Sequence, residues 1–237
     1  MTTYFPLGTN CTLAFNLKRV GVQKETGLLD NFITSYSSLL YLFERKFHFV
    51  DDNFGDYLEL IPLGHHDSVI HRPSGLILHH AFERNSDGYI KKNWRDDIEN
   101  VKSKYLYLSN RMNQSIINKK DPVFIIHGEA LNGEGSRSTL LEYQFRISQS
   151  QEVISKIILQ ARKSYERYLR FALLSVRENT LGCVEQISGV YIDNIIYHGD
   201  WYDKNPMHFG GCVRGWDEGI ARMSCMDLIK EELSREA

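Results

Sequence analysis

Cys11 is the residue of this chain whose setting best fits covalent chemistry. Turn-forming residues precede it, apolar residues then recur at helical spacing, and Gly21 is a typical end signal, so we expect a helix over 11–20. The first N–H groups and the dipole of a helix favour a thiolate and can hold an oxyanion, to which Asn10 could add a side-chain donor. The plainer interpretation is a small buried residue that caps a helix.

A thiol nucleophile needs a base, and histidine titrates nearest to neutrality. Among nine histidines, His79 and His80 have the best context, because they end an apolar stretch with strand character. Alternation along a strand should send the two rings to opposite faces, so that one can reach a cleft. For each of them, a structural histidine with satisfied hydrogen bonds is the competing interpretation.

A metal site is the rival constellation. The run His65-His66-Asp67, with His71 close behind, offers imidazoles and a carboxylate at short spacing. Neither an H-E-x-x-H nor a C-x-x-C pattern occurs, and the glycine-rich stretch 128–135 is acidic and lacks the G-K-[ST] of a phosphate loop. We therefore expect a polar loop with exposed histidines, and neither a metal nor a cofactor.

Composition narrows the class of protein. The 237 residues carry a net charge of -2, which gives no basic field to attract nucleic acid. No apolar run approaches the length of a membrane span, and the first residues do not resemble a signal peptide. The four cysteines form no paired motif, which indicates free thiols in a reducing compartment, the cytoplasm.

The elements that must position these residues follow from periodicity. Helices and strands alternate loosely with more helix, and neither a repeat nor a linker is evident. We predict one α+β domain over 1–237, with helices packed on an antiparallel or mixed sheet whose strand order the sequence does not give. The predicted helices are 37–47, 94–117, 149–179 and 216–233, and the predicted strands lie within 69–82, 122–127 and 190–197.

The opening of the chain resembles a known family. Leu7-Gly8-Thr9-Asn10-Cys11, followed by a short amphipathic stretch that ends at Gly21, is similar to the L-G-x-N-C opening of a bacterial family of papain-like cysteine peptidases, also labelled a domain of unknown function. The resemblance spans residues 4–130. The family's P-F-D-W turn is represented at 28–32 by Asp30 alone, and its H-D-F strand end by His80-Ala81-Phe82.

That resemblance implies a papain-like fold with the nucleophile Cys11 at the start of the first helix and His80 as the base, with His79 as the alternative. For a third member that orients the imidazole, Asp200 is the first choice, with Asp30 as a supporting residue, although both are also ordinary turn or cap residues.

The implied function is a thiol-dependent hydrolase, a peptidase or amidase, that attacks an amide, ester or thioester carbonyl of a peptide or acyl substrate. An acyltransferase of the same mechanism is one alternative. A non-catalytic binding or assembly protein of surface-polysaccharide biosynthesis is the other.

Overall fold

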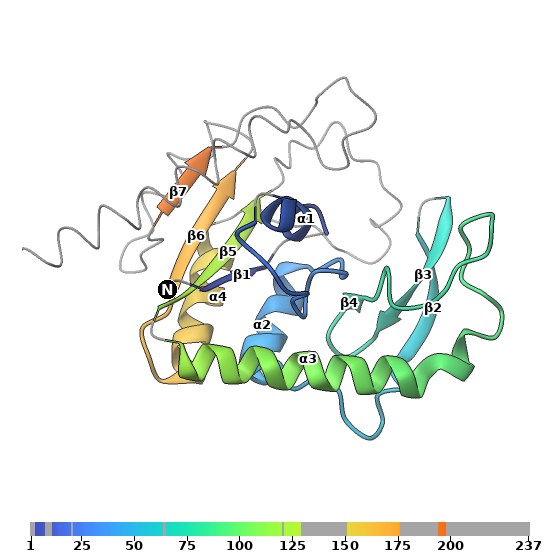
Figure 1. Ribbon diagram of the computed structural model, residues 1–237. Helices are drawn as coiled ribbons and strands as arrows, with labels where there is room; N and C mark the ends of the chain where they lie inside the picture. The colour runs from blue at the N-terminus through green and yellow to red at the C-terminus, as the bar shows by residue number, and fades with distance from the viewer. Residues whose placement is uncertain are drawn as a thin grey trace, which may run out of the picture.

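A parallel sheet forms one half of the molecule in the computed structural model, which describes residues 3–7, 11–19, 21–63, 65–119, 121–128, 151–175 and 194–197 (Figure 1). Within these residues the sheet has the strand order β1-β5-β6-β7, and all its pairs are parallel. The strands are β1 (Thr3–Pro6), β5 (Pro122–Gly128), β6 (Arg170–Ser175) and β7 (Asn194–Tyr197).

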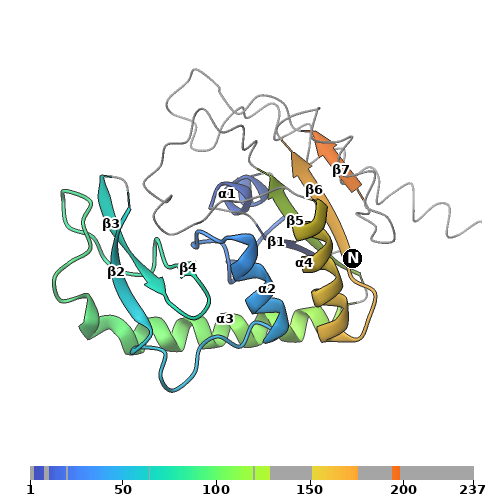
Figure 2. The same ribbon diagram turned by 180° about the vertical axis from the view of Figure 1, so that it is seen from behind.

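Parallel strands need crossover connections, and helices provide them. The β5–β6 connection contains α4 (Gln151–Tyr165), whereas the β1–β5 connection contains α1 (Thr12–Arg19), α2 (Tyr36–Glu44), the second sheet and α3 (Ile98–Asn118). Helices α2 and α4 lie side by side behind the sheet in Figure 1, and α1 lies in front of it; Figure 2 shows the same layers from behind. The Phe43 ring of α2 contacts the Phe124 ring of β5 edge to face, and this contact packs α2 against the sheet.

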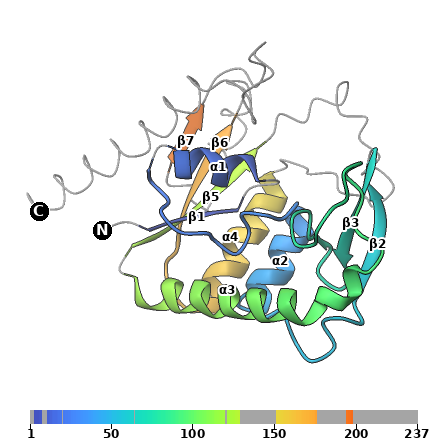
Figure 3. The same cartoon turned by 45° about the vertical axis from the view of Figure 1, so that its right-hand side comes forward.

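An antiparallel sheet forms the other half, with the order β2-β3-β4. It consists of β2 (Leu58–Leu63), β3 (His66–His71) and β4 (Leu76–Ile77). Figure 3 shows α3 running beneath both sheets, with β2 and β3 beyond its N-terminal end, where the short 3-10 helix η1 (Trp94–Asp97) leads into it. One hydrophobic cluster continues from Leu58 and Val69 of this sheet to Phe124 and Phe171 of the other.

The predicted α+β class is confirmed, as are the helices expected at 37–47 and 94–117 and the strand at 122–127. Parallel and antiparallel pairing lie in separate sheets rather than together in one mixed sheet. The helix expected over 216–233 lies outside the described residues. Within the described segments, no helix combines the length and apolar character needed to cross a bilayer.

The helix predicted over 149–179 is wrong in its second half. Helix α4 ends at Tyr165, Glu166 takes a positive φ of 50°, and the chain returns as β6. Apolar residues such as Leu169 and Ala172 continue the helical spacing, but in a buried parallel strand such residues also form an apolar run. Pairing with β5 decided the outcome, and the guanidinium of Arg162 on α4 donates to the Leu169 carbonyl just before the strand.

Candidate active site

Cys11 lies between the parallel sheet and α1. Strand β1 ends at Pro6, and the Leu7 N–H still donates to the Ile125 carbonyl (2.7 Å), so the chain leaves the carboxyl edge of the sheet just before Cys11. The Cys11 carbonyl accepts the Phe15 N–H at 2.9 Å, the first hydrogen bond of the helix. Ligands of parallel α/β sheets gather beyond this edge, and the N–H groups of a first helical turn have no partner inside the helix.

The thiol itself is half-buried, and this changes its expected ionisation. Burial raises the pKa of the Cys11 thiol above its ordinary value, and a hydrogen bond to the residue's own backbone lowers it by less. Burial therefore acts against the thiolate that the helix N-terminus is expected to favour. Burial raises this pKa by more than the hydrogen bond lowers it, so Cys11 is a neutral thiol at neutral pH.

His79 and His80 lie together rather than on opposite faces. Strand β4 ends at Ile77, so both residues fall in the turn that follows, and their ring centroids are 4.5 Å apart at 69°. The expected alternation is wrong because the strand stops before it can separate the two side chains. His79 is half-buried, and its Nδ1 is buried with no hydrogen-bond partner among the described residues. His80 is exposed.

Both imidazoles are neutral at neutral pH. Burial lowers the pKa of His79 to about 4, and the neighbouring His80, Arg84 and His66 lower it further. Burial, and after it Arg84, also lowers the pKa of His80. The Arg84 guanidinium is close because it donates to the carbonyls of His79 (3.0 Å) and Asp67 (2.9 Å) and so joins this turn to β3.

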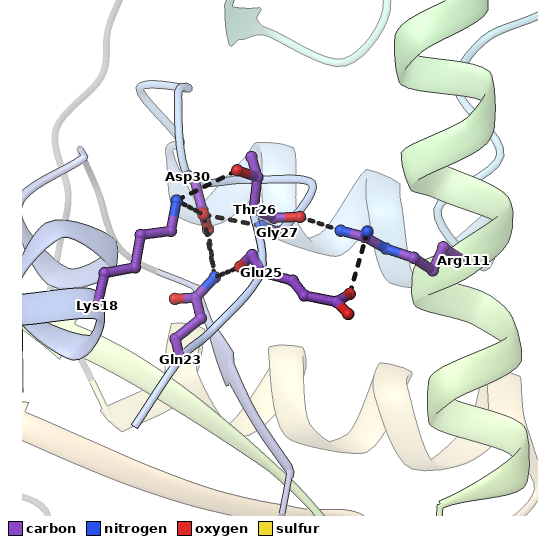
Figure 4. A network of polar contacts seen from close by, with 7 residues as sticks. All are labelled: Lys18, Gln23, Glu25, Thr26, Gly27, Asp30 and Arg111. Carbon is purple, nitrogen blue, oxygen red and sulfur yellow. Dashed lines mark hydrogen bonds and ion pairs between the residues drawn. The ribbon is translucent and has the colours of Figure 1, made fainter. Parts of the chain in front are cut away.

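Asp30 holds the end of α1 rather than an imidazole. Its carboxylate, only 3% exposed, pairs with the Lys18 ammonium of α1 at 2.7 Å and accepts the Gly27 N–H at 2.8 Å (Figure 4). The Gln23 side-chain amide donates to both carboxylate oxygens, at 3.0 and 3.1 Å. Gly27 has no room for a side chain, because a Cβ there would lie 2.7 Å from Asp30 Oδ1.

The residue after Asp30 reaches the histidine turn. The His80 N–H lies 3.4 Å from the Asn31 carbonyl, and Ile33 forms a β-bridge with Ile77 of β4. One short segment, residues 30–33, is thus attached both to the helix that follows Cys11 and to the turn that carries His80. Among the described residues, no hydrogen bond or ion pair joins the Cys11 thiol to an imidazole. Asn10 and Asp200 lie outside the described residues.

The rival metal site does not form in the described part of the chain, which contains no cluster of three or more potential metal ligands. His65 and His66 are exposed as expected, although His66 and Asp67 belong to β3 rather than to a loop. The Asp67 carboxylate accepts the Ile90 N–H at 2.6 Å. His71, by contrast, is fully buried and bonded through Nδ1 to the Ser74 hydroxyl at 2.7 Å.

Two connections in the structure are not predictable from a sequence motif. The Lys18–Asp30 pair joins residues whose spacing in the sequence suggests no contact, and no motif singles out Arg84. The turn at 85–88 could have indicated the role of Arg84, because the bend there lets its guanidinium donate to the Gly88 carbonyl (2.6 Å). Comparisons with protein-family models, with curated proteins and with solved structures gave no match to this chain.

Proposed function

We propose that this protein is a thiol-dependent hydrolase or acyltransferase of papain-like type, in which Cys11 attacks an amide, ester or thioester carbonyl. The observation that carries the proposal is the position of Cys11, half-buried at the carboxyl edge of the parallel sheet with its carbonyl opening α1. This position places a nucleophile beside the first N–H groups of a helix, which have no partner within the helix, and acyl transfer requires both.

His80 is the proposed base, and His79 supports it. A base must be unprotonated to act, and the lowered pKa of each ring meets that condition at neutral pH. His80 is the more exposed ring and is better able to meet a substrate, whereas His79 packs against it edge to face. The shared attachment of α1 and the histidine turn to residues 30–33 supports their acting in one site.

The proposed reaction begins from a neutral pair rather than from a thiolate and an imidazolium. As the Cys11 sulfur bonds to the carbonyl carbon, its proton passes to His80, and the carbonyl oxygen becomes an oxyanion held by N–H groups of the first turn of α1. The imidazolium then protonates the leaving group, which gives a thioester. Water, or an amine or hydroxyl acceptor, attacks that thioester with His80 again taking the proton, and the thiol is released.

Asp200 and Asn10 are the remaining proposed members. Asp200 would hold the imidazole by accepting its second N–H, and Asn10 would donate to the oxyanion beside the backbone. Asp30 is proposed as a positioning residue, because its partners are Lys18, Gln23 and Gly27. Replacing it should act on the placement of α1 and not on proton transfer.

Acylation by an activated ester tests the proposal. After incubation with p-nitrophenyl acetate, peptide-resolved mass spectrometry should find the acetyl group on Cys11 of the wild type and of Cys183→Ser, a matched variant that removes a different thiol. The Cys11→Ser and His80→Ala proteins should acylate at least about 100-fold more slowly, in line with the loss of a nucleophile or a general base. Equal labelling of all four cysteines would refute the proposal.

The non-catalytic alternative has one observation in its favour, the raised pKa of a thiol that bonds no imidazole among the described residues. It predicts that Cys11→Ser retains full biological activity and that acylation does not depend on His80. Testing His80→Ala in parallel with Cys11→Ser therefore separates a catalytic thiol from one that is merely accessible.

A further inference from the structure

A groove lies between β1, the segment 21–30 and α3, and it contains neither Cys11 nor the two histidines of the proposed site. Its volume is about 750 Å³, which falls within the range of small-molecule sites. The floor is apolar: Leu28 and Leu29 come from the segment, and Leu108 and Met112 come from α3. A linear or flat apolar molecule would replace water over this floor.

The side chains around the groove carry more positive than negative charge. Glu25 pairs with Arg111 at 3.2 Å, and Asp30 is neutralised by Lys18. Lys24 and Lys119, which also line the groove, are exposed and form no ion pair within the described residues. The mouth therefore carries an excess of two positive charges, which attract an anion.

The wall formed by 21–30 is fixed by its own contacts (Figure 4). The Arg111 guanidinium donates to the Thr26 carbonyl, and the Gln23 side-chain amide donates to the Glu25 carbonyl at 2.9 Å. Asp30 anchors the same segment through the Gly27 N–H. A wall held in this way does not have to be ordered when a ligand binds, which reduces the cost of association.

We propose that this groove is a binding site for a small amphipathic anion, with an apolar body over the leucine floor and a carboxylate or phosphate at Lys24 and Lys119. The site is independent of the proposed chemistry of Cys11. Apolar contact gives the affinity, and the ammonium groups of Lys24 and Lys119 select the sign of the head group.

Matched amphiphiles test the charge selection. Decanoate, decyl phosphate and decyltrimethylammonium share a chain and differ in head group, and isothermal titration calorimetry with the full chain below their micelle concentrations measures binding. Both anions should bind at least about tenfold tighter than the cation, which corresponds to two exposed charge pairs. The Lys24→Glu/Lys119→Glu double variant should lose that preference, whereas Lys92→Glu, a surface lysine outside the groove, should keep it.

A steric variant tests the location. Ser115 lines the groove from α3 and is partly exposed, so Ser115→Trp should fill the apolar space and weaken both anions and the cation together by about tenfold or more. Cys11→Ser should bind all three as the wild type does, which keeps this result separate from the acylation experiment. Equal affinity for anion and cation, no binding at all, or binding unchanged in both variants would overturn the proposal.

Discussion

The buried histidine of β3 makes protein stability depend on pH in a way that can be isolated. His71 is fully buried, its ring is stacked on Phe54 at 5.5 Å, and the edges of Phe49 and Tyr57 close the cage. Its Nδ1 bonds the Ser74 hydroxyl, while Nε2 has no partner among the described residues. Protonation would add a charge and a second N–H inside an aromatic cage in which the described residues offer Nε2 no acceptor.

Burial accordingly lowers the pKa of His71 from 6.5 to about 4, opposed in part by Asp51, which raises it, and assisted by Arg45, which lowers it. Between these pH values His71 binds a proton in the unfolded chain but not in the folded chain. The free energy of unfolding therefore falls as the pH falls from 6.5 towards 4. The free energy of unfolding should drop by about 2 kcal/mol between pH 7 and pH 5 from this residue, and by about 3 kcal/mol in total.

The His71→Phe variant isolates this contribution, because phenylalanine fills the aromatic cage but does not titrate. Urea unfolding followed by fluorescence at pH 5, 6 and 7 gives the free energy for both proteins, and His79, which also titrates low, contributes equally to each. The wild type should lose about 2 kcal/mol more than the variant over this range. If the free energies of unfolding of the two proteins change with pH in parallel, within about 0.5 kcal/mol, His71 reaches water in the folded protein and this prediction is wrong.

Three further outcomes follow from single contacts. Gly27→Ala should lower the free energy of unfolding in urea by about 1–3 kcal/mol, because the new Cβ would crowd Asp30 Oδ1 at 2.7 Å. An unchanged free energy would mean that the side chains of Figure 4 can move aside without cost. Tyr105→Phe should leave stability unchanged or raise it by up to about 1 kcal/mol, since the buried hydroxyl has no partner in the described part of the chain, and a clear loss would reveal one. Iodoacetamide labelling of Cys11, measured by peptide mass spectrometry, should keep accelerating up to and beyond pH 9, because burial raises the thiol pKa above its ordinary 9.0; a plateau below pH 8 would contradict this.

Local patterns predicted the elements that depend on local residues. Helix α3 has a long apolar stripe, and Gly21 ends α1 with the positive φ of 77° that glycine tolerates best. Strand β6 was missed because its apolar run also satisfies a helical spacing, and only a parallel partner on β5 decides between the two. Which strands pair, and in which direction, depends on contacts between distant segments that one sequence does not contain.

The site shows the same division between local and distant information. That Cys11 begins a helix could be predicted, because turn residues and periodicity are local. The ionisation of its thiol could not, since it depends on burial in the folded protein, which raises the thiol pKa. The buried Asp30 carboxylate likewise required Lys18 and Gln23, neither of which a motif connects to it.

The raised thiol pKa and the lowered imidazole pKa together determine how a catalytic Cys11 must respond to pH. Because the neutral pair reacts only through proton transfer to His80, acylation should be flat across neutral pH and fall only when His80 becomes protonated, below its ordinary 6.5. Simple alkylation needs no base and follows the thiolate, so it should rise through the same range. Measuring the rates of reaction with p-nitrophenyl acetate and with iodoacetamide from pH 5 to 9 on one protein therefore distinguishes the ionisation of His80 from that of Cys11. Identical profiles for the two reagents would mean that His80 does not assist Cys11, and the hydrolase proposal would fail.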